Sequence, residues 1–344
     1  MFSPELATGL ELVVAGVIGL SLLIYLLTGG ADFGGGVLDL LARGPRAKAQ
    51  RELIAHAIGP IWEANHVWMI LVVVLLFVCF PKGFAALSTG LHIPLTLLLF
   101  GIVLRGSAFV FRAYGARGDD EVAQWGRIFA SSSVISPLAL GITAGAVVGG
   151  ALRVEPSSGK LLSGFVSSWA TPFALSMGVL TLALCTYLAA VYLTCEADDE
   201  ALREDFRRRA LGSAVFVGAS AWVALAFAWR VVPHVAEGLL SSWWALPFQL
   251  LTGVLALGAI LSLVLRRYTW ARFLAVGQVA LILLGWAGVQ LPWLIVPDLS
   301  LHAAAAPPEV LRMTLWVLGV GSLVLVPSFI YLFYIFKNRA KHAG

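Results

Sequence analysis

The residues best suited to chemistry lie in one apolar stretch that runs from His56 to Trp68. If the stretch forms a single helix, His56 and Glu63 share one face of it, and His66 lies less closely on the same face. Counted along such a helix from residue 54, Glu63 lies about 14 Å into the span. An ionisable side chain at that depth is costly, so it implies a charged partner or a water-filled path. The stretch therefore predicts a group that exchanges protons through water.

Two interpretations of Glu63 compete. Its depth favours a proton-transfer group over an acid that a neighbour merely neutralises. Gly59 and Pro60, just before it, would loosen the backbone and make room for water. His56 lies near the membrane surface, where we expect a solvated or capping residue. Three neighbours are expected to pack and to hold the helix face: Trp62, Asn65 and Trp68. Of these, Asn65 is the best candidate for a polar contact between helices.

A second polar feature is the glycine-rich segment 28–36, which contains Asp32. It has neither the GxGxxG pattern nor a P-loop lysine, so we expect no nucleotide site. The glycines predict close helix approach and a tight turn, with Asp32 at the mouth from which Glu63 would be supplied. Arg105 ends a later span on the same side. It either extends its charge to the interface or pairs with Asp32 or Glu63.

Other catalytic patterns are absent from the sequence. There is no Ser-His-Asp spacing and no HExxH motif. Glu63 and His66 match half of a di-iron carboxylate signature, which needs a second such pair and two further acids. His92 falls in mid-span and is interpreted as a hydrogen-bonded core residue. The cysteines lack CxxC spacing, so no disulfide framework or zinc site is indicated: they are Cys79, Cys185 and Cys195.

The composition predicts an all-α integral membrane protein. Of 344 residues, 60% are hydrophobic and only 12% are charged, whereas soluble domains contain about 25% charged residues. The segment Met1 to Thr8 holds Glu5 and no Lys or Arg, so we expect the first helix to be retained as an anchor. A span needs about 20 apolar residues. The predicted spans are residues 10–28, 54–80, 84–104, 127–150, 166–193, 210–230, 243–265, 271–291 and 312–336.

The basic residues alternate between the two sides of these spans. Of the 23 Lys and Arg residues, 18 lie on one side: Arg43, Arg46, Lys48, Arg51, Arg105, Arg112, Arg117, Arg127, Arg203, Arg207, Arg208, Arg209, Arg266, Arg267, Arg272, Lys337, Arg339 and Lys341. The other side has Lys82, Arg153, Lys160, Arg230 and Arg312. Loops rich in Lys and Arg stay in the cytoplasm, which predicts an N-terminus outside and a cytoplasmic C-terminus. Topology thus explains the net charge of +4 without a nucleic-acid partner.

We expect one membrane domain over residues 1–344, built from two four-helix units and one extra helix. Residues 1–150 form the first unit with the polar residues, and residues 151–291 form the second. Residues 292–344 then supply an outer loop, the ninth helix and a basic tail. A loose similarity between residues 13–32 and 174–196 indicates the repeat, an arrangement known from transporters.

Three segments together resemble subunit II of the cytochrome bd-type quinol oxidases. They are Gly30-Ala-Asp32-Phe-Gly34, Gly59-Pro-Ile-Trp62-Glu63-Ala-Asn65-His-Val67-Trp68 and Leu104-Arg105-Gly-Ser-Ala-Phe109-Val-Phe-Arg112. The nine spans, the outside N-terminus and the pair Pro292-Trp293 agree along nearly the whole chain. The form Trp-Glu-Ala-Asn-His resembles the cyanide-insensitive branch of the family.

The resemblance implies a heterodimer in the bacterial plasma membrane that oxidises quinol and reduces oxygen to water. Haems b and d would lie on the haem-bearing subunit I, so this chain would ligate no haem or metal and hold no catalytic residue. A small single-helix subunit, membrane lipid and a structural quinone are further expected partners. The proton-path candidates are Glu63, Asp32, Arg105, His66 and His56.

This chain departs from the family pattern at several positions. Some members have aspartate at Glu63, histidine at Ile61 and acids at Gly29 and Val110. Either this chain keeps a complete proton path of the family's type, or the route has shifted into subunit I.

Two other hypotheses remain. A proton-coupled secondary transporter is motivated by the repeat and the membrane acid, but the apolar second half favours the partner subunit. A haem ligated by His56, His66 or His92 ranks last.

Overall fold

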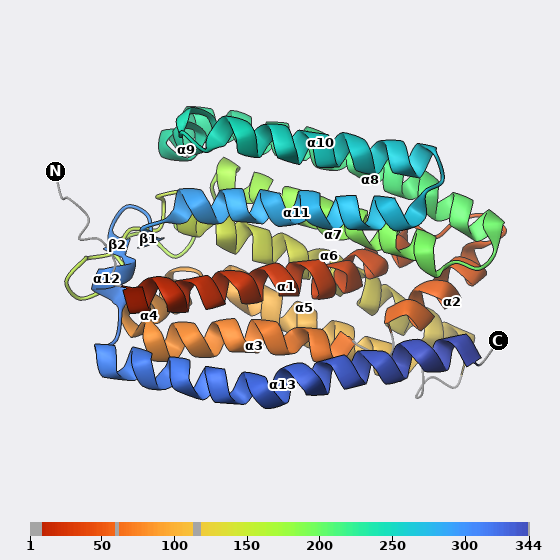
Figure 1. Ribbon diagram of the computed structural model, residues 1–344, viewed down its shortest axis with the longest axis horizontal. Helices are drawn as coiled ribbons and strands as arrows, with labels where there is room; N and C mark the ends of the chain where they lie inside the picture. Colours follow the sequence, from red (N-terminus) through yellow and green to blue (C-terminus); the bar gives the residue numbers. More distant parts are fainter. Residues whose placement is uncertain (1–8, 59–61, 113–117, 343–344) are drawn as a thin grey trace.

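The computed structural model describes residues 9–58, 62–112 and 118–342. These residues form a bundle of long helices with one short β-hairpin (Figure 1). The elements are α1 (Gly9–Leu40), α2 (Ala47–Ile58), α3 (Trp62–Cys79), α4 (Pro81–Gly90), α5 (His92–Val110), α6 (Asp119–Val148), α7 (Pro172–Glu196), α8 (Glu200–Val231), α9 (Pro233–Ser241), α10 (Ala245–Val264), α11 (Tyr268–Gln290), β1 (Trp293–Ile295), β2 (Leu299–Ser300), α12 (Leu301–Ala304) and α13 (Pro308–His342).

The membrane-spanning helices agree with the predicted fold class. Within the described ranges, eight helices are long and apolar enough to cross a membrane, and a ninth span results if α2 and α3 form one bent span. The long helices run side by side (Figure 1). We name the end of the bundle that carries α2 the basic end, and the end that carries β1 and β2 the hairpin end.

Helix α1 continues through the glycines that were predicted to form a turn, and it ends only at Leu40. A glycine inside a helix costs about 1 kcal/mol relative to alanine. Here the glycines allow two neighbouring helices to approach closely, because a Cβ at Gly34 would collide with the carbonyl oxygen of Cys185 in α7. A Cβ at Gly36 would collide with the Ser133 hydroxyl of α6. The predicted close approach is confirmed, and the predicted turn is wrong.

The predicted span 54–80 is divided into two helices. Helix α2 ends at Ile58 and α3 begins at Trp62, and their axes meet at 54°. Gly59 and Pro60 lie outside the described residues, but a proline ends helices because its ring clashes with the preceding turn. His56 and Glu63 therefore belong to different helices, and the prediction that they share a helical face is wrong. Glu63 occupies the first turn of α3, so its depth cannot be counted from residue 54.

The predicted span 84–104 is also divided, into α4 and α5. His92 is the first residue of α5, at the hairpin end, and its side chain is exposed. Its Nδ1 lies 3.1 Å from the Thr89 carbonyl oxygen, and its ring centroid lies 5.2 Å from that of Phe165. The interpretation of His92 as a core residue in mid-span is wrong, because the span is shifted toward Val110.

Several other helices extend beyond their apolar segments. Helices α6 and α8 begin before the predicted spans, with charged first turns that hydropathy does not detect. Asp199 begins α8, since its carboxylate accepts hydrogen bonds from the N–H groups of Ala201 and Leu202. Helix α7 begins later than predicted, at Pro172, and the Thr171 hydroxyl accepts from the next turn.

The centre of the bundle is α7, which packs against α1, α6, α8 and α11. Buried alanines along α7, among them Ala183 and Ala190, leave room for these close neighbours. Helix α1 packs against α3 and α6 as well, so its polar residues face three helices. Helix α13 lies on the outside of the bundle against α1 and α3 (Figure 1).

The hairpin end is closed by the segment that was predicted as a long outer loop. Strands β1 and β2 pair in antiparallel fashion, and Asp298 in their turn binds the guanidinium of Arg153 at 2.7 Å. The Asp298 carboxylate also accepts a hydrogen bond of 2.9 Å from the Val154 N–H. His302 of α12 lies 3.2 Å from the Glu11 carboxylate of α1. These contacts connect the loop segments to the helices.

Candidate functional site

Asp32 and Asn65 meet in the interior of the bundle, between α1 and α3. The Asn65 amide Nδ2 donates a hydrogen bond of 2.6 Å to Asp32 Oδ2. Asp32 is only 6% exposed and Asn65 only 2%. Because a buried polar group without a partner is costly, this bond fixes the relative rotation of the two helices. The predicted contact of Asn65 between helices is confirmed, but Asp32 lies inside the bundle rather than at a mouth.

Arg105 of α5 places a positive charge beside this pair. Its side chain is 1% exposed, and Nη2 donates a hydrogen bond of 2.9 Å to the backbone carbonyl of Asp32. The guanidinium carbon lies 5.2 Å from the ring centroids of both Phe33 and Phe129. Of the two predicted alternatives, extension to the interface is therefore wrong. Arg105 is buried because α5 continues past it to Val110.

Two aromatic residues of α1, Tyr25 and Phe33, connect His66 to the region of Asp32 and Arg105. The Tyr25 hydroxyl and His66 Nδ1 are 3.3 Å apart. The His66 ring centroid lies 6.1 Å from that of Phe33, the same ring that Arg105 contacts. We refer to Asp32, Asn65, Arg105, His66 and Tyr25 together as the interior polar cluster. It unites three of the five predicted proton-path residues.

The other two candidates, Glu63 and His56, lie outside the interior polar cluster. Both side chains are exposed on the surface of the described chain. Trp68 stacks on Phe329 of α13, with ring centroids 5.7 Å apart, and so takes the packing role predicted for it. Trp62 begins α3, and its side chain lies outside the described part of the molecule.

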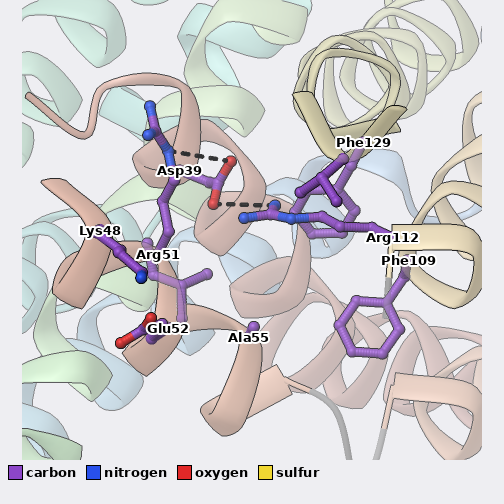
Figure 2. A pocket seen from close by; sticks show the side chains of 10 residues that line it. Asp39, Lys48, Arg51, Glu52, Ala55, Phe109, Arg112 and Phe129 are labelled. Atoms are coloured by element: carbon purple, nitrogen blue, oxygen red, sulfur yellow. Dashed lines mark hydrogen bonds and ion pairs between the residues drawn. The ribbon is translucent and has the colours of Figure 1, made fainter. Parts of the chain in front are cut away.

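A second cluster of charged side chains lies at the basic end, formed by Asp39, Arg51 and Arg112 (Figure 2). It was not predicted from the sequence. Asp39 of α1 is 4% exposed; its Oδ1 lies 3.2 Å from Arg112 Nη1 and its Oδ2 lies 4.0 Å from Arg51 Nε. Asp39 follows Asp32 by about two helical turns, so the two acids share a face of α1. That spacing is readable in the sequence, but the turn predicted at residues 28–36 concealed it.

The interior polar cluster can hold charge inside the membrane and exchange protons. A buried acid and a buried cation compensate each other where water is scarce. The Nε atom of Arg105 is buried and has no hydrogen-bond partner among the described residues. A polar atom of this kind is a position where ordered water can bind. The carboxyl group of Asp32 and the imidazole and phenol groups of His66 and Tyr25 gather around the same turns of α1 and α3, so water between them could complete a path for protons.

Comparison with known proteins places this arrangement in a family. The model for cytochrome bd terminal oxidase subunit II matches residues 10–336. The cytochrome bd ubiquinol oxidase subunit 2 of Bacillus subtilis is 25% identical over 329 residues, which are 91% of both chains. The Escherichia coli K12 cytochrome bd-I ubiquinol oxidase subunit 2 is 25% identical over 182 residues, 52% of this chain and 46% of that one.

A solved structure shares the fold. The bd oxidase from Geobacillus thermodenitrificans superposes with a TM-score of 0.79 at 22% identity, covering 96% of this chain and 99% of that one. The resemblance seen in the three sequence segments is thereby confirmed. Since the family match includes the whole interior polar cluster and nearly every helix, the chain belongs to the subunit II family of cytochrome bd terminal oxidases and is a multi-pass protein of the bacterial inner membrane.

Proposed function

We propose that this chain is the haem-free partner of a haem-bearing subunit I, and that its interior polar cluster delivers protons toward the chemistry on that subunit. As a member of its family, the chain works in a quinol oxidase that reduces oxygen, with haem and quinol in the complex. Because the chain belongs to this family, we no longer propose that it is a secondary transporter.

The position of the histidines supports the assignment of haems b and d to subunit I. His56 lies on α2 at the basic end, whereas His92 begins α5 at the hairpin end. His66 is engaged with Tyr25 in the interior polar cluster. Two axial ligands of one haem must lie on opposite faces of the same site. His56 and His92 lie at opposite ends of the bundle, so they do not meet this requirement.

One observation carries the proton-delivery proposal: the buried Asp32 receives a hydrogen bond on its carboxylate from an amide of α3 and one on its backbone carbonyl from the Arg105 guanidinium of α5. Ionisable residues in membrane spans are costly and are functional by default. A structural clamp between α1, α3 and α5 is the competing interpretation of the same geometry, since breaking one partner of a buried pair is strongly destabilising. The experiments below separate the two.

Glu63 extends the proposal toward the partner subunit. Along α3 the exposed side chains Ile70, Val74 and Phe77 lie on the same face as Glu63 by helical spacing. A carboxyl group that faces lipid is costly, so we expect a partner subunit with polar groups to cover this face of α3. Asn65, two positions on, points to the opposite side of α3, into the interior polar cluster. A proton could thus pass from Asp32 across the first turn of α3 to subunit I.

The remaining partners follow from the resemblance. A small single-helix subunit has room on α13, because none of the residues in the most apolar stretch of this helix is buried by the described chain. Membrane lipid covers whatever part of that face no helix occupies. A bound structural quinone is proposed on the resemblance alone.

The test uses the assembled oxidase complex reconstituted in vesicles. Asp32→Asn and Glu63→Gln each remove the proton-exchanging group at nearly constant volume. We expect haem spectra and subunit ratios equal to wild type, and a fall of about tenfold or more in quinol-dependent oxygen uptake and in voltage. Glu309→Gln, an exposed acid in the first turn of α13, is the matched control and keeps full activity.

Two results would reject proton delivery. Full oxygen uptake and normal voltage in Asp32→Asn and Glu63→Gln would show that neither carboxyl transfers protons. Loss of haem or of subunit I in Asp32→Asn would identify the interior polar cluster as the structural clamp instead.

A further inference from the structure

A cavity of about 420 Å³ opens at the basic end, between α2, α5 and α6 (Figure 2). We refer to it as the basic-end cavity. The interior polar cluster lies behind its inner wall, because Phe129 lines the cavity and also contacts the Arg105 guanidinium. None of the residues proposed for proton delivery lines the cavity itself.

The charged lining of this cavity is positive in sum. Three cations, Lys48, Arg51 and Arg112, face two acids, Asp39 and Glu52. Figure 2 shows Asp39 between the two guanidinium groups, with one carboxylate oxygen toward each. The Asp39 side chain is 6% exposed, whereas that of Arg51 is 43% exposed. The acid is therefore buried behind the arginines, and the cations face the opening.

The arginines are held in place with N–H groups to spare. Arg112 bonds Asp39 through Nη1, and Arg51 bonds the Ala42 carbonyl oxygen through Nη2 at 3.3 Å. A guanidinium has five N–H donors in a planar fork, and within the described ranges these contacts use only some of them. Preoriented guanidinium groups bind phosphate oxygens in pairs and more tightly than mobile cations do. Lys48, one turn before Arg51 on α2, adds a third donor.

The rest of the lining is apolar. Ile54, Phe109, Val122 and Phe129 form the walls below the charged rim. Next to Phe109, Val110 belongs to an exposed apolar strip of α5 that includes Val103 and Leu104 and runs along the bundle. A free phosphate ion would gain nothing from such walls. A ligand with an anionic head and an apolar tail would bury both parts.

We propose that the basic-end cavity binds an anionic phospholipid, with its phosphate on Lys48, Arg51 and Arg112 and its acyl chains along α5. Basic pockets between membrane helices bind anionic headgroups in this way. The cavity lies at the basic end, where α1 ends at Leu40 and the chain turns into α2. We expect the headgroups at this end, because Lys and Arg gather in the loops next to the membrane surface. The lipid would connect α2 to α5 and α6, whose residues line the cavity together.

The test measures lipid binding to the delipidated oxidase complex by native mass spectrometry during titration with phosphatidylglycerol. Each basic side chain near an anionic headgroup contributes about 1 kcal/mol, or about fivefold in affinity. Lys48→Gln/Arg51→Gln should therefore bind the tightest phosphatidylglycerol about 25-fold more weakly. Lys48→Arg/Arg51→Lys keeps both charges and should stay within about threefold of wild type.

The matched control is Arg43→Gln/Arg267→Gln, which removes two exposed charges at the same end but outside the cavity. It should bind as wild type does. If the double variant fails to assemble with haem, Lys48→Gln alone is measured, with a loss of about fivefold expected. Phosphatidylcholine, which is zwitterionic, should bind more weakly than phosphatidylglycerol.

Three results would overturn the proposal. One is a phosphatidylglycerol affinity of Lys48→Gln/Arg51→Gln, or of Lys48→Gln where the double variant does not assemble, that equals the affinity of the wild type. Another is an equal loss in the Arg43→Gln/Arg267→Gln control, which would indicate general surface charge. The third is displacement of the lipid by millimolar inorganic phosphate, which would make the cavity a site for soluble anions.

Discussion

The Asn65 amide and the Asp32 carboxylate lie 2.6 Å apart in the bundle interior, where one hydrogen bond joins α3 to α1. Neither side chain is more than 6% exposed. Helix α3 thus supplies the hydrogen-bond donor of the buried Asp32 through Asn65. The residue after Asn65, His66, contacts Tyr25 of α1. Stability and the proposed proton delivery therefore involve the same few atoms, and mutations must be chosen to separate them.

Replacing Asn65 by leucine should destabilise the complex. The Asp32 carboxylate would lose its amide donor, and an unsatisfied buried polar group costs about 1–3 kcal/mol. Thermal unfolding of the purified complex, followed by haem absorbance, measures the loss. In the double variant Asp32→Leu/Asn65→Leu both partners are gone, so the cost should be smaller than the sum of the single changes. Additive costs would show that the two residues are not coupled.

Changes at Arg105 should depend on charge and on shape. Arg105→Met removes the cation that binds the Asp32 backbone carbonyl and lies near the Asp32 carboxylate. Loss of one partner of a buried pair costs at most about 3–5 kcal/mol. Arg105→Lys keeps the charge but loses the planar contacts with Phe33 and Phe129, which are worth about 2 kcal/mol when desolvated. The yield of haem-loaded complex should fall in the order wild type, lysine, methionine. Adding Asp32→Asn to Arg105→Met should recover part of the yield; no recovery would mean that Asp32 is uncharged in the folded protein.

Gly34→Ala should prevent close packing of α1 on α7. The new Cβ would collide with the Cys185 carbonyl and lie 2.8 Å from the Ala189 Cβ, and such overpacking costs about 1–3 kcal/mol or more. Gly16→Ala in the same helix is the control, because nothing lies within 4 Å of its Cβ. It should be neutral or stabilise the helix by up to about 1 kcal/mol. Equal unfolding temperatures of the two variants would contradict the packing assigned to Gly34.

The contact between Asp298 and Arg153 should make the hairpin end sensitive to acid. Burial acts to raise the pKa of Asp298, but the Arg153 and Val154 hydrogen bonds and the Arg153 charge outweigh it and hold that pKa below its usual value. A carboxyl with a lowered pKa stabilises the fold above its ordinary pKa of about 3.9, and this contribution disappears as the pH falls further. Because the Arg153 side chain is 53% exposed, we expect only about 1 kcal/mol.

Asp298→Asn tests this dependence. Its thermal unfolding should occur below that of wild type at pH 7, and the difference should close below about pH 4. Glu237→Gln, an exposed acid of α9 at the same end, should show no difference at either pH. A gap between Asp298→Asn and wild type that does not narrow at all between pH 7 and pH 3 would indicate loss of packing rather than of charge.

Haem should appear only with the partner subunit. The chain expressed alone should show no haem absorption, whereas co-expression with subunit I should yield haem bands and both chains in one complex. Substitution of His66 by glutamine should leave the band positions of that complex unchanged. Haem bands in the isolated chain would refute the assignment of haem to subunit I.

Local composition is enough to predict much of this protein. Hydropathy measures the transfer of side chains into lipid, which depends on neighbouring residues only, so the membrane class and the number of spans were predictable. The motif residues Asp32, Asn65 and Arg105 were also found from the sequence, because polar residues in apolar spans are conspicuous. The loops rich in Lys and Arg gave the predicted orientation in the same way.

Contacts between distant helices decided the rest. The segment with Gly34 and Gly36 has a low helix propensity, and only close packing on α7 and α6 keeps it helical to Leu40. That extension placed Asp32 inside the bundle and Asp39 at the basic end, a pair that the sequence had not connected. The sequence by itself determined that polar residues such as Asp32, Asn65 and Arg105 lie in or beside apolar spans. The tertiary structure alone decided which of them meet, because packing energy between helices depends on shapes that only the assembled bundle brings together.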